Sequence, residues 1–189
     1  MVICVFGASS NDIDKCYIEQ TELLCEELAK RGHSLIFGGG KNGLMGAAVR
    51  GFARGGAKTV GVAPEFFRPA NVIYEECDEF VWTESMRDRK KYMEDNADAF
   101  IITPGGVGTY EEFFEVLTLK QLGQHKKPIA IFNIKGFYDK LLNVVDDNVK
   151  DGFVRANVPS MYMVSDDMKA VIDYVENDDF QMGELKLYG

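Results

Sequence analysis

The chain has 189 residues, of which 46% are hydrophobic, and this suits one well-packed α/β domain rather than two. Its formal net charge of −9 argues against a nucleic-acid partner, because binding to a phosphate backbone requires a basic surface. A small phosphorylated ligand is compatible with this charge, since such a ligand meets only the local charges of its pocket.

The cysteines and the opening of the chain favour a reducing compartment. The four cysteines show no Cys-x-x-Cys spacing, and residues 1–6 lack the cationic start of a signal peptide. We therefore expect free thiols and a cytoplasmic protein. No apolar run approaches the roughly 20 residues of a membrane span, so no membrane partner is expected. His33 and His125 have no ligand-type neighbours at metal spacing, which predicts no metal site.

Apolar runs alternate with helical periodicity along the chain. We expect seven strands, at residues 2–6, 34–37, 59–62, 79–82, 99–102, 128–133 and 161–164. We expect helices at residues 13–31, from the turn at 38–46 to about 54, at 86–93, at 113–119, at 138–150 and from 166 to about 176. This alternation predicts an α/β fold with one doubly wound, mainly parallel sheet. With no linker or repeat, we expect a single domain over residues 1–189, with a peripheral tail from about residue 177.

Small-residue turns follow the first two predicted strands. The first turn contains Ser9 and Ser10, which are either ligand contacts at the carboxyl end of the strand or plain turn and cap residues. The second turn, at residues 38–46, is rich in glycine, and we take Gly39 and Gly40 as candidate ligand contacts.

Two later segments allow more than one interpretation. Residues 65–78 are irregular and contain several aromatic residues, so they form either a lid over a site or a covering loop. The next helix carries four cations, a run that is usually a solvated basic face. Its spacing nevertheless places Arg89 or Lys90 beside Met86 and Met93 on the inner side, where an arginine usually meets an anion.

The strongest site signal is a glycine-rich turn after the strand at residues 99–102. We take its glycines and the threonine that follows them as ligand contacts: Gly105, Gly106, Gly108 and Thr109. Glycines let the backbone approach a ligand closely, and the unpaired N–H groups at a helix start attract an anion such as a phosphate. The turn lacks the Gly-Lys-Ser/Thr ending of a nucleoside triphosphatase and departs from the dinucleotide fingerprint.

Two carboxylates, Glu111 and Glu112, come next and are expected in the first turn of the following helix. Acidic residues are common there because they stabilise the helix dipole. The sharper hypothesis is that a carboxylate beside a phosphate cradle acts chemically on the molecule that carries the phosphate.

Two motifs occur together in this chain, Met86-x-x-Arg89-Lys90 and then Pro104-Gly105-Gly106-x-Gly108-Thr109-x-x-Glu112. The pair resembles the signature of the LOG ("Lonely guy") family of cytokinin riboside 5′-monophosphate phosphoribohydrolases, which are often mislabelled lysine decarboxylases. Other segments similar to the family pattern are residues 38–46, 112–118, 121–128 and 136–138, and the resemblance extends from about residue 2 to residue 165.

The resemblance implies a Rossmann-like fold and a homodimer or higher assembly with the site near the subunit interface. It also implies hydrolysis of a nucleoside 5′-monophosphate to free base and ribose 5-phosphate. In the family pattern, Arg89 and Glu112 match the catalytic residues. The positions that match the binding residues are Lys90, Thr118 and the turn that runs from Gly106 to Glu112, which includes Val107, Tyr110 and Glu111.

Three positions depart from the family pattern. Arg87 stands where histidine is usual and adds a charge at the rim of the site. Gly7 and Ala8 replace Cys-Gly before the two serines. Asn71 falls where plant members have a glutamate near the substrate, so Asn71 is a candidate contact and the preferred base, adenine or a cytokinin, stays open.

The expected mechanism follows from the charge that develops on the sugar. Cleavage of an N-glycosidic bond builds positive charge on the ribose, which requires a nearby carboxylate, and we choose Glu112. The turn would anchor the 5′-phosphate, Arg89 would hold Glu112 or a substrate oxygen, and Lys90 would add positive potential. No metal or redox cofactor is required.

Two other functions compete with this hypothesis. A non-catalytic carrier or sensor of a phosphorylated ligand, such as a molybdopterin-cofactor carrier, could keep the glycine-rich cradle, but it has no need of Arg89 together with Glu112. Lysine decarboxylation is disfavoured because no lysine sits in a setting typical of a pyridoxal phosphate Schiff base.

Overall fold

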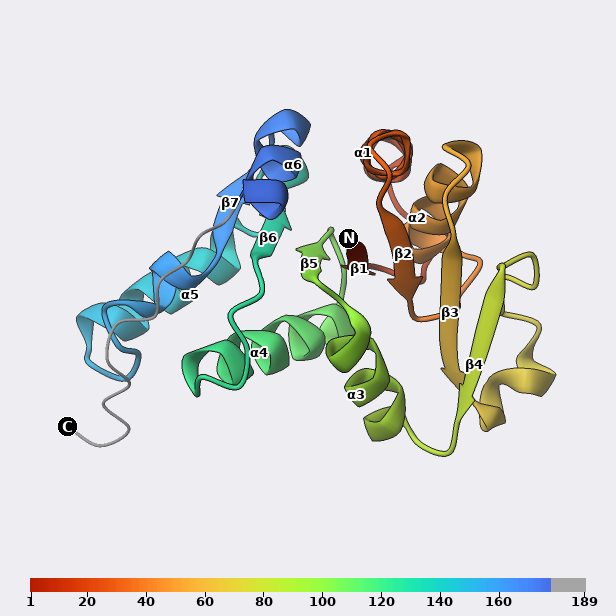
Figure 1. Ribbon diagram of the computed structural model, residues 1–189. Helices are drawn as coiled ribbons and strands as arrows, with labels where there is room; N and C mark the ends of the chain where they lie inside the picture. Colours follow the sequence, from red (N-terminus) through yellow and green to blue (C-terminus); the bar gives the residue numbers. More distant parts are fainter. Residues whose placement is uncertain (178–189) are drawn as a thin grey trace.

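A computed structural model describes residues 1–177, which build one sheet of seven parallel strands (Figure 1). The strand order across the sheet is β4-β3-β2-β1-β5-β6-β7. The strands are β1 (Val2–Phe6), β2 (Ser34–Phe37), β3 (Thr59–Pro64), β4 (Glu79–Thr83), β5 (Ala99–Ile102), β6 (Ile129–Phe132) and β7 (Met163–Ser165). In the register of the central strands, Val5 of β1 lies opposite Phe37 of β2 and Ile101 of β5. The predicted α/β class with a parallel sheet is confirmed.

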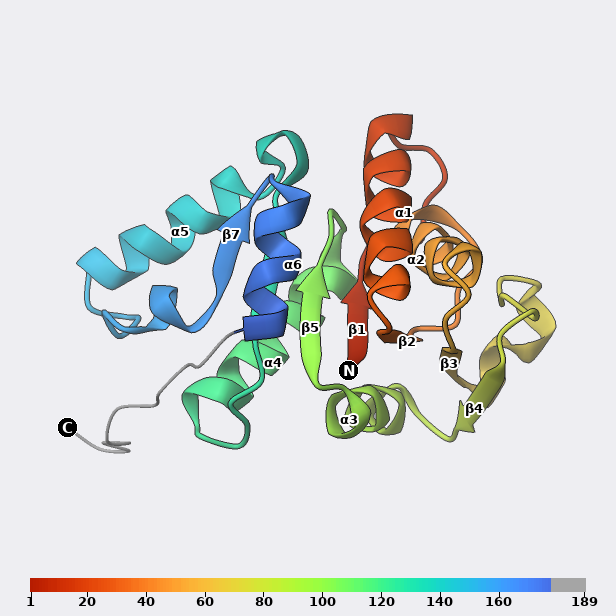
Figure 2. The same ribbon diagram turned by 45° about the horizontal axis from the view of Figure 1, so that its top comes forward.

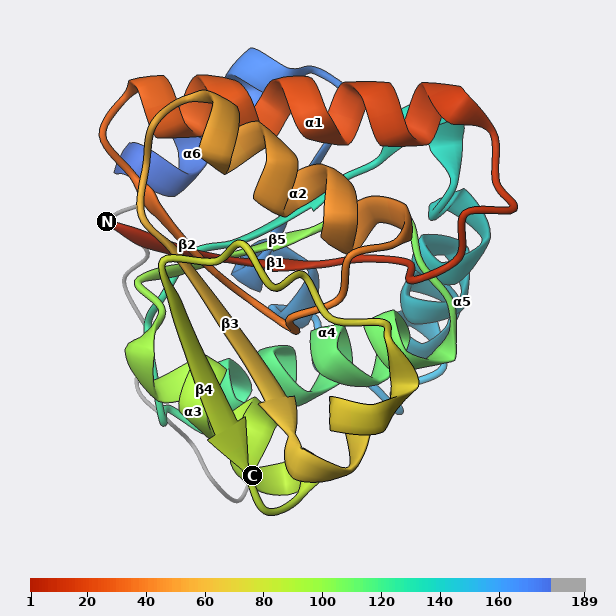
Figure 3. The same ribbon diagram turned by 90° about the vertical axis from the view of Figure 1, so that its right-hand side faces the viewer.

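Helices cover both faces of the sheet (Figure 3). The α-helices of the described residues are α1 (Lys15–Lys30), α2 (Gly43–Arg54), α3 (Met86–Asn96), α4 (Val107–Gln121), α5 (Asp139–Lys150) and α6 (Met168–Asn177). Short 3₁₀ helices are η1 (Glu65–Ala70), η2 (Ile134–Gly136) and η3 (Val158–Met161). Helices α1, α2 and α6 pack on one face, whereas α3, α4 and α5 pack on the other, so the sheet is doubly wound.

The central strands are apolar along their whole length because both of their faces are buried. Ile3 and Val5 of β1 belong to the core beneath α1 and α2, while Cys4 and Phe6 belong to the core on the opposite face. Successive side chains of a strand point to opposite faces, so a strand between two helical layers needs an apolar residue at every position.

Local capping moves some of the predicted boundaries. The first helix begins at Lys15 rather than residue 13, because the Asp14 side chain caps it by accepting a hydrogen bond from the Cys16 N–H. The last strand begins at Met163 rather than residue 161, because η3, with its early Pro159, occupies the preceding residues.

The chain changes direction across the sheet at β1, which lies beside β5 at the centre (Figure 2). It leaves β1 toward β2 on one side and later returns to β5 on the other, an arrangement that opens a crevice at the strands' carboxyl ends. The turns there are tied together, since the Ala8 N–H donates to the Pro104 oxygen at 3.0 Å and the Leu44 N–H donates to the Ala8 oxygen at 2.8 Å.

Within residues 1–177 no helix is both long and apolar enough to cross a lipid bilayer. The tail predicted from about residue 177 falls on residues 178–189, which lie outside the described residues. A single domain over the whole chain therefore stays a prediction.

Helices α1 and α2 approach closely at Gly51, where an added Cβ would collide with the Glu22 carbonyl oxygen and lie 2.7 Å from the Cβ of Cys25. We predict that Gly51→Ala lowers the free energy of unfolding by about 1–3 kcal/mol, because the helices must separate to admit the methyl group. Urea denaturation measures the change. Ala53→Ser, at an exposed position of α2, is the control, and equal stability of Gly51→Ala and the wild type would contradict the prediction.

Candidate active site

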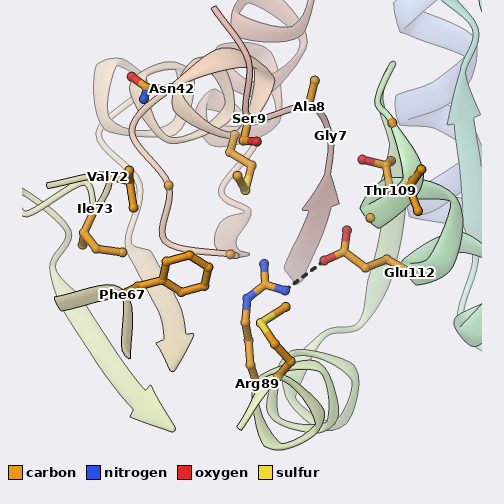
Figure 4. A pocket seen from close by; sticks show the side chains of 17 residues that line it. Gly7, Ala8, Ser9, Asn42, Phe67, Val72, Ile73, Arg89, Thr109 and Glu112 are labelled. Atoms are coloured by element: carbon orange, nitrogen blue, oxygen red, sulfur yellow. Dashed lines mark hydrogen bonds and ion pairs between the residues drawn. The ribbon is translucent and has the colours of Figure 1, made fainter. Parts of the chain in front are cut away.

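A pocket of about 460 Å³ opens at the carboxyl ends of β1, β2 and β5 (Figure 4). Its walls come from the turns after those strands, from α3 and α4, and from the segment after β3. The lining residues are Gly7, Ala8, Ser9, Gly38, Gly40, Asn42, Met45, Phe67, Val72, Ile73, Met86, Arg89, Gly106, Val107, Gly108, Thr109 and Glu112.

The pocket has a polar side and an apolar side. Thr109 and Glu112 of α4 lie on one side with Arg89 of α3, and Phe67 and Ile73 lie across from them (Figure 4). A ligand that fits both sides carries a charged or hydroxyl-rich end and a flat or apolar end.

The N-terminus of α4 faces the pocket with free donors. Gly106 is the N-cap residue and no side chain caps this helix. The N–H groups of Val107, Gly108 and Thr109 have no acceptor inside the helix, because the carbonyls they would need precede it. These three residues line the pocket, so the positive end of the helix dipole is directed at it.

The N-terminus of α2, after the other glycine-rich turn, is different. The N–H groups of Leu44 and Met45 both donate to the Ala8 oxygen, and the Gly43 N–H donates to Oδ1 of Asn11 at 2.8 Å. Because the loop after β1 takes up these donors, the α2 turn has a structural role, and the α4 turn is the one whose N–H groups remain open to an anion.

The space around the glycines also distinguishes the turn into α2 from the turn into α4. A Cβ added at Gly106 or Gly108 would meet no protein atom within 4 Å and would project into open space. A Cβ at Gly39, by contrast, would lie 2.7 Å from the Phe80 ring, and Gly39 also has a positive φ of 73°. Protein packing thus requires glycine at Gly39, whereas at Gly106 and Gly108 the absent side chains leave open space beside the α4 N-terminus.

Arg89 is buried and held from three directions. Its Nε donates to the carbonyl oxygen of Val62 at 3.2 Å, and its Nη1 donates to Oε1 of Glu112 at 3.0 Å. A Cβ at Gly38 would collide with the guanidinium, so only glycine at that position admits Arg89. These contacts fix the guanidinium plane against the pocket wall.

Glu112 is nearly buried, with 11% of its side chain exposed. Burial raises the pKa of Glu112, and the nearby positive charge of Arg89 only partly offsets this effect. Its other carboxylate oxygen takes no part in the Arg89 hydrogen bond, which leaves it available to a ligand. The expectation that Glu111 and Glu112 occupy the first helical turn was wrong, because α4 begins at Val107 and both lie in its second turn.

A cluster of charges lies beside this pair. Lys90 pairs with Glu111 and, at 2.5 Å, with Glu115 of α4. Burial alone would lower the pKa of Lys90, but its hydrogen bonds to these two carboxylates raise it. Glu94 lies near the same group, and burial together with the charge of Glu115 raises its pKa to about 7.

Comparison with known proteins identifies the family. Residues 45–175 match a family model described as possible lysine decarboxylase. The chain is 36% identical over 183 residues to cytokinin riboside 5′-monophosphate phosphoribohydrolase LOG2 of Arabidopsis thaliana, which covers 94% of this chain and 86% of that relative. The chain belongs to the LOG family. A second LOG relative, from Oryza sativa subsp. japonica, is 41% identical over 152 residues, which covers 80% of this chain and 63% of that relative.

The LOG fold is shared with proteins of other function. The structure of the molybdenum cofactor carrier protein of Chlamydomonas reinhardtii matches with a TM-score of 0.70 and 21% identity, covering 93% of this chain and 95% of that chain. At this identity the likeness shows the fold alone. The expected Rossmann-like fold is confirmed.

The structure brings half of the predicted site residues of this LOG protein to one pocket. They are Ser9, Gly40, Arg89, Gly106, Val107, Gly108, Thr109 and Glu112. The other predicted residues lie outside the pocket wall, namely Ser10, Gly39, Asn71, Lys90, Gly105, Tyr110, Glu111 and Thr118.

Several of these outer residues have structural partners instead. The Ser10 hydroxyl accepts a hydrogen bond from the Asp12 N–H, and Oδ1 of Asn71 accepts one from Nζ of Lys41 at 2.8 Å. Asn71 also has a positive φ of 46°, a conformation that asparagine tolerates better than glutamate. Thr118 is exposed, farther along α4.

The motifs did not predict the apolar side of the pocket, which is formed by Phe67, Val72 and Ile73. Two methionines, Met45 and Met86, also line the pocket. Residues 65–78 were open to interpretation as a lid or a covering loop, and the structure attaches this segment to the glycine turn through a bridge between Gly40 and Ile73. The Lys41 N–H also donates to the Val72 oxygen at 2.8 Å. The aromatic content of the segment was the available signal.

Glu94 makes stability depend on pH. Its pKa of about 7 lies above that of an unfolded glutamate, so its contribution is complete below pH ~4.5 and is lost as the pH rises toward 7. We predict that Glu94→Gln gains roughly 1 kcal/mol of unfolding free energy relative to the wild type between pH 4.5 and pH 8, a figure reduced for partial exposure. Urea denaturation at both pH values measures the gain. Glu84→Gln, at an exposed position, controls for the lost charge, and a gain at neither pH would contradict the assignment.

Proposed function

We propose that this LOG-family protein hydrolyses the N-glycosidic bond of a nucleoside 5′-monophosphate, AMP or a cytokinin riboside 5′-monophosphate, to free base and ribose 5-phosphate. The observation that carries the proposal is the pairing, in one pocket, of the open α4 N-terminus with the buried Arg89–Glu112 pair. The names of relatives such as LOG2 of Arabidopsis thaliana support the same reaction.

The 5′-phosphate would bind at the start of α4. The N–H groups of Val107, Gly108 and Thr109 and the Thr109 hydroxyl are donors for its oxygens, and the space beside Gly106 and Gly108 admits it. Phosphate binding at a distance from the reacting bond holds the sugar in one orientation, so that binding energy serves the chemical step.

Glu112 would act at the anomeric carbon, one helical turn from the phosphate. As the C1′–N bond breaks, its electron pair leaves with the base and positive charge grows on the ribose, which the carboxylate stabilises. Water adds its oxygen to C1′, and the proton it loses passes through Glu112 to the base. A raised pKa suits this exchange, because a carboxylate with a pKa nearer neutrality accepts and returns a proton more readily.

The base would lie against the apolar side of the pocket. Phe67, Val72 and Ile73 form this side, and an adenine ring or an isoprenoid substituent removes apolar surface from water there. Asn71 and Lys41, which are hydrogen-bonded to each other at the border of the pocket, are then candidates to influence the choice of base.

The carrier alternative fits the fold but does not use the ion pair. The likeness to a molybdenum cofactor carrier protein concerns the fold at 21% identity. A carrier of a phosphorylated ligand has no need of a buried carboxylate paired with an arginine beside the anion site, whereas hydrolysis of the glycosidic bond uses one. The description of the family as a possible lysine decarboxylase meets a further difficulty, since no lysine is among the described residues that line the pocket.

We also propose a homodimer with the pocket near the subunit interface, located in the cytoplasm. Exposed apolar side chains on and beside α4 support the assembly, among them Val107, Phe114 and Leu122. The four cysteines are free, which supports a reducing compartment.

Glu112→Gln removes the carboxylate charge and keeps the size of the side chain. We predict that release of adenine from AMP falls by about 10²–10⁴-fold, because the developing positive charge on the ribose loses its stabilising partner. Liquid chromatography of the released base measures the rate. Glu111→Gln, at a half-exposed neighbouring position, is the control, and unchanged turnover in Glu112→Gln would reject the mechanism.

Gly108→Ala separates packing from ligand binding. The added methyl group enters open space, so the free energy of unfolding should rise by about 0.5–1 kcal/mol as alanine replaces a helical glycine. The same methyl group occupies the phosphate position, and we predict that the KM for AMP rises at least about tenfold. Urea denaturation and steady-state kinetics test the two effects, and a KM equal to that of the wild type would place the phosphate elsewhere.

A further inference from the structure

Tyr138 lies behind the Pro104–Gly106 turn, called the phosphate turn because it leads into the proposed phosphate-binding N-terminus of α4. Its side chain is buried, with 1% exposed, and it does not line the pocket. Its hydroxyl donates to the carbonyl oxygen of Thr103 at 2.7 Å. Thr103 directly precedes the Pro104–Gly106 turn, so this hydrogen bond acts on the segment that leads into α4.

The chain places Tyr138 through a rigid turn at the end of the neighbouring strand β6. Oδ1 of Asn133 accepts a hydrogen bond from the Tyr138 N–H at 2.7 Å, and Nδ2 of Asn133 donates to Oδ1 of Asp139 at 2.8 Å. Between Asn133 and Tyr138 in the sequence, Lys135 and Gly136 have positive φ values of 55° and 68°. A side chain amide and a left-handed turn thus fix the tyrosine before α5 begins.

The other side of the phosphate turn is held by β1. The N–H and the hydroxyl of Thr103 both donate to the carbonyl oxygen of Phe6 at 2.9 Å. The Ala8 N–H donates to the Pro104 oxygen at 3.0 Å. With Tyr138 on the β6 side, the residues before Gly105 are fixed from both neighbouring strands.

Tyr138 also contacts the helix that supplies the donors. Its ring packs edge-on against Tyr110 of α4, with ring centres 5.9 Å apart. Burial raises the pKa of the Tyr138 hydroxyl, while the nearby Gly105 N–H lowers it, so this hydroxyl is a neutral donor at physiological pH that lies close to two backbone groups of the turn.

We infer that Tyr138 is a positioning residue, which fixes the direction of the α4 N-terminal N–H groups by its hydrogen bond to Thr103. The inference rests on the proposed function, because the phosphate of the substrate is what these groups would bind. Without the hydroxyl, the buried Thr103 carbonyl loses this partner and the turn shifts to find another. Loss of this hydrogen bond weakens the binding of the phosphate and leaves the contacts of the base and the ribose unchanged.

The test compares substrates with and without the phosphate. We predict that Tyr138→Phe lowers kcat/KM for AMP by about tenfold, mainly through KM, and leaves the slower hydrolysis of adenosine unchanged. Tyr162→Phe is the matched control, because Tyr162 is a buried tyrosine of the same layer that packs on Phe113, away from the turn. General destabilisation would lower kcat/KM equally for both substrates. A ratio of kcat/KM for AMP to kcat/KM for adenosine equal to that of the wild type would overturn the inference.

Calorimetric binding of ribose 5-phosphate to the same proteins separates this inference from the proposed function. If the wild type cleaves no nucleoside 5′-monophosphate, the proposed function fails, and a tenfold weaker binding by Tyr138→Phe would still support the positioning role. Asn133→Ala keeps the hydroxyl and removes the amide that holds the Tyr138 backbone, so it should weaken binding in the same direction by about threefold. Unchanged affinity in both variants would overturn the role of Tyr138.

Discussion

The ion pair between Arg89 and Glu112 constrains the region of the fold around it. Two almost completely buried charges destabilise a fold unless each has further hydrogen-bond partners. Here the Arg89 guanidinium also donates to the Val62 carbonyl oxygen. The same group requires the missing side chain at Gly38. One guanidinium therefore constrains which residues can stand in β3, in the turn after β2 and in α4, three elements that are far apart in the sequence. This explains why a charged residue can lie inside an otherwise apolar layer.

Two glycine-rich turns that look alike in sequence have different roles because their N–H groups have different partners. The turn into α2 gives its donors to Ala8 and Asn11, so it joins the loops at the carboxyl ends of the strands. In the turn into α4 the N–H groups face the pocket without a protein acceptor, because the N-cap residue Gly106 has no side chain to accept from them. The first turn forms part of the pocket wall, and the second directs the positive end of a helix dipole into the pocket.

The fold alone does not decide the function of this LOG protein. A carrier protein of another function shares the architecture with a TM-score of 0.70. In this chain the features that bear on function are the side chains around the crevice and those that support it from behind. Tyr138, which lies between η2 and α5, is an example of a residue outside the pocket that we infer to fix the direction of its donors.

The sequence by itself determined the order of strands and helices and the parallel sheet, because apolar runs and turn residues are local signals. It also identified the α4 turn and paired Arg89 with Glu112, since the two motifs that contain them resemble one family signature. Only the tertiary structure decided which predicted residues share a pocket, for example Ser9 but not Ser10. It also revealed the apolar side formed by Phe67 and its neighbours. Those outcomes depend on contacts between distant segments, and in particular on which backbone donors are already satisfied by another part of the chain, which no local pattern records.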